Sequence, residues 1–249
     1  MSINSFTKSH IVEYHELNTK EHIREYELGN LVQQAAAEHA DLLKRGYNDL
    51  KKLGKAWMMS RVCYSFYSLP KASDKIFIET WVDNFDRLYS HRDCHICDSN
   101  NSLLAAVRTV WMVVDIEKRK IESVVPFVDL FPTIAGKCFD NKSVDRIKPF
   151  TEEPMYISKQ KVTYSALDIM GHSNNAKYIE WFCDGMPNNW HSEKSIKQLT
   201  VNFLHETKLN DELTLKYKWE IIEGSILLFC NVYSSEFNTF VTTFKAILE

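Results

Sequence analysis

One order of predicted elements occurs twice along the chain: a strand, a helix and then four more strands. In the first half a loosely alternating segment at 6–17 precedes apolar residues that recur at helical spacing over 28–45. Segments rich in β-branched and aromatic residues then predict strands at 57–68, 75–83, 89–97 and 103–115. The second half has a strand at 155–164, a helix after Ser173 and strands at 197–205, 213–221, 225–233 and 239–248. Side-chain identity between the halves is low, so the pattern repeats rather than the sequence.

This duplicated order predicts an α+β fold of two similar units. An antiparallel sheet wrapped around one buried helix is the hotdog arrangement, and two copies make a double hotdog. The predicted boundaries are an N-terminal hotdog unit at 1–125, a connecting segment at 126–154 and a C-terminal hotdog unit at 155–249. The connecting segment contains four of the six prolines and lacks a regular apolar pattern, which favours a long connection with one short helix.

Composition excludes several classes of function. With 45% hydrophobic residues the chain can build a hydrophobic core. Its formal net charge of −3 does not favour binding to nucleic acid or to an anionic membrane. There is no run of about 18 apolar residues and no secretory signal, so no membrane span is expected. Six cysteines without such a signal predict reduced thiols and a cytoplasmic protein. We expect no metal and no cofactor, because Cys94 and Cys97, three apart on a strand, would point to opposite faces.

Residues 167–181 carry the clearest chemistry of the chain. A glycine followed by Ser and Asn residues favours a turn and a cap, so a helix is expected to begin at Ser173 or Asn174. Asp168 and His172 therefore lie in a loop that leads into a helix N-terminus. Backbone N–H groups and the helix dipole favour developing negative charge there, as an acyl-transfer enzyme requires for its oxyanion.

This stretch resembles the motif of the plant-type acyl-[acyl carrier protein] thioesterases, a family with bacterial members. Their motif is close to D-L-D-x-N-x-H-x-N-N-x-x-Y-I-x-W, followed further along by an E-C pair. The matching residues here are Asp168, His172, Asn174, Asn175, Tyr178, Ile179 and Trp181, with Glu206 at the acid position. Similar segments follow in the family's order at 57–61, 79–82, 92–93 and 110–112. The resemblance spans nearly the whole chain and implies hydrolysis of acyl-acyl carrier protein thioesters to free fatty acid, which terminates fatty acid synthesis.

Two residues depart from the family motif. Met170 stands where the family has Asn, and Thr207 stands where plant members have Cys after the Glu. A papain-like mechanism with that Cys as nucleophile cannot operate here unchanged. The remaining groups, Asp168, His172 and Glu206, favour attack by a water molecule that a carboxylate and an imidazole assist.

The resemblance also implies a role for each catalytic candidate. Glu206 is expected to act as general base or water-orienting carboxylate. His172 is expected to orient the water, to hydrogen-bond the thioester or to hold Glu206. Asp168 is expected to fix His172 or the loop. As supporting residues, Asn174 and Asn175 are expected to cap the helix and pin the loop.

The substrate needs an oxyanion hole and an apolar slot. Backbone N–H groups at 173–175 are the candidate oxyanion donors. By resemblance, the first unit holds the acyl chain and the second holds the catalytic groups. The candidate substrate-binding residues are Trp57, Met59, Trp81 and Trp111, although large aromatic residues on strands are commonly core.

The expected partner is acyl carrier protein with its acyl chain. That carrier is acidic, so a basic rim would favour encounter. The densest basic cluster is Lys44, Arg45, Lys51, Lys52 and Lys55, which also fits a solvated helix end.

Three alternatives stay open: an acyl-CoA thioesterase, a dehydratase and a non-catalytic acyl-binding hotdog protein. Monomer and homodimer are both compatible with a double hotdog, since one chain already supplies two sheets.

Overall fold

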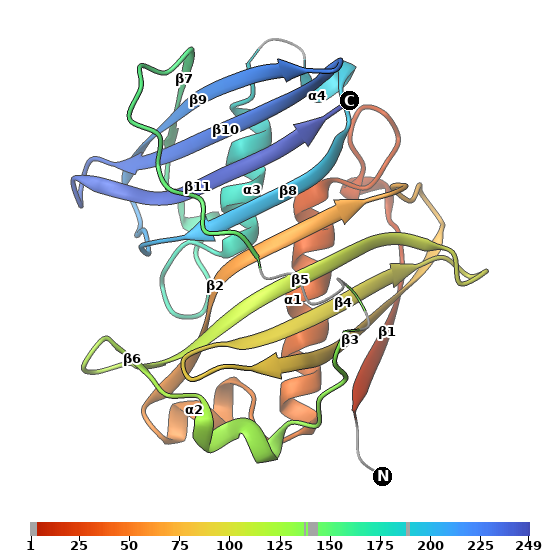
Figure 1. Ribbon diagram of the computed structural model, residues 1–249, viewed down its shortest axis with the longest axis vertical. Helices are drawn as coiled ribbons and strands as arrows, with labels where there is room; N and C mark the ends of the chain where they lie inside the picture. The colour runs from red at the N-terminus through yellow and green to blue at the C-terminus, as the bar shows by residue number, and fades with distance from the viewer. Residues whose placement is uncertain (1–3, 137, 139–143, 188–189) are drawn as a thin grey trace. The chain divides into compact units, whose positions relative to one another are not determined.

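The computed structural model contains two compact units, residues 1–144 and 145–249, each with an antiparallel sheet and a main helix (Figure 1). The structure describes residues 4–136, 138, 144–187 and 190–249. The division falls inside the predicted connecting segment, 126–154. Among the described residues, no helix is both long and apolar enough to cross a membrane.

In its described residues, the first unit contains six strands and two α-helices. The strands are β1 (Ser5–Ile11), β2 (Lys55–Phe66), β3 (Lys75–Phe85), β4 (Ser90–Cys97), β5 (Leu103–Asp115) and β6 (Lys120–Glu122). They pair antiparallel in the order β1-β3-β4-β5-β2, and β6 pairs with β5. The helices are α1 (Glu25–Leu42) and α2 (Tyr47–Lys52), with short 3-10 helices η1 (Tyr14–Glu16) and η2 (Val125–Leu130).

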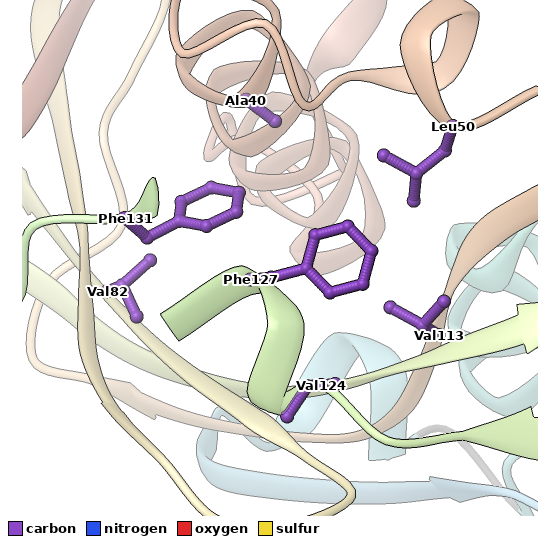
Figure 2. Packing of buried hydrophobic residues seen from close by; sticks show 7 residues of the cluster. All are labelled: Ala40, Leu50, Val82, Val113, Val124, Phe127 and Phe131. Carbon is purple, nitrogen blue, oxygen red and sulfur yellow. The ribbon is translucent and has the colours of Figure 1, made fainter. Parts of the chain in front are cut away.

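One face of this sheet packs on α1. The core cluster in Figure 2 joins Ala40 of α1 to strand and loop residues, and its other members are Leu50, Val82, Val113, Val124, Phe127 and Phe131. Small residues on the buried side of α1 let the helix lie close to the strands. Phe127 and Phe131 come from the segment predicted as a connection, and both are buried in the core of the first unit.

The other face of the same sheet carries a buried ion pair. Arg108 of β5 donates to both carboxylate oxygens of Asp93 on β4, each at 2.6 Å, and lies 3.3 Å from Asp83. The N–H of Gly136 donates to Asp83 Oδ1 at 2.6 Å. Because a buried charge is costly without partners, these bonds stabilise the segment after η2 against this face.

The second unit repeats the plan, with five strands in the part that the structure describes. They are β7 (Tyr156–Lys161), β8 (Ile196–Phe203), β9 (Glu212–Ile222), β10 (Ser225–Ser234) and β11 (Thr239–Leu248), paired antiparallel in the order β8-β11-β10-β9-β7. Its helices are η3 (Tyr164–Ala166), α3 (Asn175–Asp184) and α4 (Trp190–Glu193). Phe182 of α3 stacks on Phe244 at 4.7 Å between ring centroids, and Tyr217 donates to the Phe182 carbonyl at 2.9 Å. The helix is thus buried against its sheet.

The predicted double hotdog is confirmed, with both units showing a sheet packed on one main helix. Within the described residues, the elements that were not predicted are α2, α4 and β6, together with the 3-10 helices η1 and η3. Gly46, which marks the end of the first predicted helix, is also the N-cap of α2. A helix of six residues contains too few turns for an apolar period to be visible in the sequence.

Candidate active site

The loop before α3 is a tight turn built around the Asp168 carboxylate. Oδ1 of Asp168 accepts hydrogen bonds from the backbone N–H groups of Met170 (2.8 Å) and His172 (3.3 Å). The Asp168 N–H donates to the His172 carbonyl at 2.7 Å. Gly171 lies between them with a φ of 77°, a left-handed conformation that glycine adopts without strain. The carboxylate therefore shapes the loop, as expected from its sequence position, and bonds to backbone rather than to the imidazole in the described structure.

The start of α3 leaves one backbone donor available. Asn174 is the N-cap, and its side chain accepts from the Ala176 N–H at 2.9 Å. Of the three predicted oxyanion donors, the Ser173 N–H bonds to the Thr207 carbonyl at 3.0 Å and the Asn174 N–H bonds to the Ala166 carbonyl at 2.9 Å. Asn175, the first residue of the helix, makes no such backbone bond within the described ranges. Its N–H is therefore the donor that a bound oxyanion can use.

The structure brings His172 and Glu206 together from distant parts of the chain. His172 Nε2 lies 3.3 Å from Glu206 Oε2, and the side chains are 18% and 22% exposed. His172 comes from the loop before α3, and Glu206 follows the end of β8 by three residues. Because both side chains keep some exposure, a water molecule can reach the pair. This is the contact between an imidazole and a carboxylate that the resemblance implies.

Three hydroxyl groups, those of Ser173, Thr207 and Tyr178, are hydrogen-bonded to one another next to the segments that carry this pair. Thr207, which occupies the position of the plant cysteine, is fully buried. Its Oγ1 lies 2.7 Å from Ser173 Oγ and 2.7 Å from the Tyr178 hydroxyl. Burial raises the pKa of Tyr178 to about 12, so its hydroxyl stays protonated. A buried hydroxyl with two hydrogen bonds is not placed to attack a substrate, and the sequence did not predict this cluster.

The four predicted substrate-binding residues do not share one surface. Met59 of β2 pairs with Trp111 of β5, and Trp57 lies on the same face two residues earlier, packed against the cluster of Figure 2. Trp81 lies next to Val82, a member of that cluster, so its side chain points to the opposite face of the sheet. Trp81 is fully buried there and packs edge-on against an imidazole. Side chains alternate along a strand, so Trp81 lies apart from the other three candidates, and its substrate-binding role stays a prediction.

The predicted basic cluster proves to be α2 and its flanks. Lys52 lies 3.6 Å from an aspartate of α2, and Lys55 lies 2.5 Å from a glutamate of β6. Lys51 lies over the ring of Tyr47 at 5.4 Å. Arg45 donates to the Lys44 carbonyl at 2.6 Å. Four of the five basic side chains thus have local partners, and the two ion pairs reduce the charge available to a docking protein.

The first unit contains a backbone copy of the site loop. Oδ1 of Asn18 accepts from the N–H groups of Lys20 (2.9 Å) and His22 (3.2 Å), and the Asn18 N–H donates to the His22 carbonyl at 2.7 Å. Glu21 holds the left-handed position with a φ of 63°. His22 therefore corresponds to His172, Asn18 to Asp168 and Glu21 to the loop glycine.

The loop of the first unit has no carboxylate at the position that corresponds to Glu206. The Ile23 N–H donates to the Pro70 carbonyl at 2.9 Å, just as the Ser173 N–H donates to the Thr207 carbonyl. The residue before Pro70 is Leu69, which therefore corresponds to Glu206. The two loops share a backbone, and only the second pairs its histidine with a carboxylate at this position.

Comparison with protein families assigns both halves of the chain. Residues 3–129 match the model of the acyl-ACP thioesterase N-terminal domain, and residues 151–243 match that of the acyl-ACP thioesterase C-terminal domain. The chain is 24% identical over 226 residues to the chloroplastic oleoyl-acyl carrier protein thioesterase 2 of Arabidopsis thaliana, covering 83% of this chain and 61% of that protein. It spans 60% to 62% of the length of the three oleoyl-acyl carrier protein thioesterases that it matches.

Solved structures show the same fold. An acyl-ACP thioesterase from Bacteroides thetaiotaomicron superposes with a TM-score of 0.87 at 24% identity, covering 99% of this chain and 98% of that one. A 12:0-ACP thioesterase from Umbellularia californica superposes with a TM-score of 0.85 at 15% identity, covering 98% and 97%. Both likenesses extend over the two hotdog units together.

Proposed function

Since the chain belongs to the acyl-ACP thioesterase family, we propose that it hydrolyses acyl-acyl carrier protein thioesters to free fatty acid and carrier protein. The observation that carries this proposal is the 3.3 Å contact between His172 Nε2 and Glu206 Oε2, close in sequence to the start of α3. Family membership supplies the class of reaction. The contact supplies a base that can activate water.

In the proposed reaction, Glu206 takes a proton from a bound water as the water oxygen attacks the thioester carbonyl. His172 holds Glu206 and orients the water. The carbon–sulfur bond of the tetrahedral intermediate then breaks, and the leaving sulfur recovers the proton from Glu206. Thiols are acidic, so this step needs little assistance. Oriented acid–base help of this kind contributes about 10²–10⁴-fold to the rate.

The oxyanion of the intermediate would be stabilised at the beginning of α3. The Asn175 N–H is the available donor there, and the helix dipole adds partial positive charge. Asn174 holds this helix turn in place through its cap. Asp168 fixes the loop that presents His172, so its role is to position rather than to transfer a proton.

The acyl chain is proposed to bind on the face of the first sheet that packs on α1. Trp57, Met59 and Trp111 share that face and are apolar, whereas Trp81 does not. The proposed partner is an acidic acyl carrier protein, and the basic residues around α2 are its candidate contact. A cytoplasmic location, where the cysteines would stay reduced, belongs to the same proposal.

Release of thiol from two matched substrates tests this function. We expect the protein to release thiol from acyl-acyl carrier protein faster than from the same acyl group on coenzyme A, in parallel incubations. A Glu206→Gln variant serves as the control for enzyme-catalysed release. Release from the coenzyme A ester alone would instead identify an acyl-CoA thioesterase. Saturable acyl binding without thiol release would identify a binding protein and contradict the proposal.

A further inference from the structure

The buried hydroxyls of Ser173, Thr207 and Tyr178 connect the two segments that carry the His172–Glu206 pair. We propose that these three residues form a positioning network that sets the separation of His172 and Glu206 during thioester hydrolysis. This inference rests on the function proposed above. It assigns no proton transfer to the hydroxyls, because all three side chains are buried.

Each end of the network is covalently next to a member of the pair. Ser173 follows His172, and Thr207 follows Glu206. Two hydrogen bonds join Ser173 to Thr207, one between the side-chain oxygens at 2.7 Å and one from the Ser173 N–H to the Thr207 carbonyl at 3.0 Å. A relative shift of the two backbone segments must therefore break or stretch these bonds.

Tyr178 ties the network to α3 and to the end of β8. Its ring packs against Trp181 at 5.2 Å and against Phe203, the last residue of β8, at 5.8 Å. Its hydroxyl reaches Thr207 at 2.7 Å and remains protonated, since burial raises the pKa of Tyr178 to about 12. The phenol can thus donate to Thr207 while the threonine donates to Ser173. All three groups lie in the interior, where a hydroxyl that loses its partner is costly.

The loop of the first unit is an internal control for this interpretation. The positions that correspond to Ser173, Thr207 and Tyr178 are Ile23, Pro70 and Leu28. All three are buried, and the loop keeps its backbone bond from the Ile23 N–H to the Pro70 carbonyl at 2.9 Å. The fold of the loop therefore does not require hydroxyls at these positions. The hydroxyls occur only in the second of the two loops, the one paired with Glu206, and this difference points to a role in the site.

The network is tested by removing one hydroxyl without changing its shape. We expect Thr207→Val and Tyr178→Phe to lower kcat for acyl-acyl carrier protein by about 10- to 100-fold, because small misplacements of reacting groups have effects of this size. KM should change little, since both side chains are buried away from solvent. Thr207→Ser retains a hydroxyl at this position and should keep kcat within about threefold of the parent. Melting temperatures are measured for each variant.

Thr243→Val is the matched control, because Thr243 is a buried threonine of the same unit whose Oγ1 donates to the Ile147 carbonyl at 3.2 Å. We expect it to lower the melting temperature without lowering kcat. An equal loss of kcat in this control would assign the effect to stability and overturn the inference. Parental kcat in both Thr207→Val and Tyr178→Phe would overturn it as well. If the parent protein releases no thiol from acyl-acyl carrier protein, the proposed function itself fails, whereas parental kcat in the two hydroxyl variants refutes the network alone, so the two failures are distinguishable.

Discussion

The two loops that lead into α1 and α3 have the same backbone and different chemistry. Asn18 and Asp168 each accept two backbone N–H groups through one side-chain oxygen, and the next left-handed residue closes each turn. His22 and His172 then occupy the same place in the turn. The loop conformation is thus encoded by a short polar side chain and a left-handed residue, and it does not by itself make a site.

The difference lies in what the neighbouring segment provides. In the first unit that segment supplies Leu69, next to Pro70, and the positions that correspond to the three hydroxyl residues are the buried apolar residues Ile23, Leu28 and Pro70. In the second it supplies Glu206, with Thr207 and its hydroxyl partners beneath. One carboxylate and a few buried hydroxyls therefore separate a structural turn from a catalytic candidate. Each substitution below tests one part of that contrast.

The histidine pair should give the largest difference between the loops. We expect His172→Ala to lower kcat by about 100-fold or more, because the imidazole holds the base and orients the water. His22→Ala should leave kcat within about twofold of the parent, since no carboxylate stands at the position of Glu206 in its loop. Steady-state thiol release from acyl-acyl carrier protein measures both variants. Similar losses in the two would show that the first loop also takes part in the reaction.

The carboxylate in the turn should matter much less. Asp168→Asn gives the second loop the residue type of the first, and the amide oxygen can accept the same two N–H groups. We therefore expect kcat to fall by less than about tenfold, well below the effect of losing a general base. Asp168→Ala, which removes both bonds, should lower the melting temperature as well. A loss in Asp168→Asn as large as that in His172→Ala would assign a direct role to the charge.

The helix caps should give the smallest difference, and it concerns stability. Asn174 caps α3 through its side chain, whereas the N-cap of α1, Arg24, makes no such bond. Asn174→Ala is expected to cost about 0.5–2 kcal/mol of stability. Arg24→Ala should cost less than Asn174→Ala, because it removes no cap bond and only the half-buried guanidinium that donates to the His15 carbonyl at 2.7 Å. Thermal unfolding of the two variants beside the parent measures the contrast, and equal shifts would argue against the cap.

Alternation of apolar and polar residues was sufficient to predict most of the fold. The strand predicted at 239–248 is β11, Thr239–Leu248, and the strand predicted at 103–115 is β5, Leu103–Asp115. α2 was not predicted, because one short helix between a glycine and a strand has no visible period. The core role of Phe127 and Phe131 was also missed, since prolines nearby favour an irregular segment that can still bury aromatic side chains.

Local sequence predicted the site only as far as local contacts define it. The turn at Asp168 and the cap at Asn174 depend on neighbours in the chain, and the structure has both. The oxyanion donors depend on distant partners. The Ser173 N–H is already bonded to the Thr207 carbonyl, so the Asn175 N–H is the donor that remains available. The hydroxyl network likewise needs β8 to end beside α3. A comparison of the two halves position by position would have shown hydroxyls replacing apolar residues, which is the one signal the sequence offers.

Thiol release by the Glu206→Gln variant tests the central claim most directly. The amide keeps the size of the side chain and can still bond to His172, but it cannot accept a proton from water. With acyl-acyl carrier protein at saturating concentration, we expect kcat to fall by about 10²–10⁴-fold while the melting temperature stays near the parental value. A folded Glu206→Gln protein that hydrolyses this substrate at the parental rate would contradict the account.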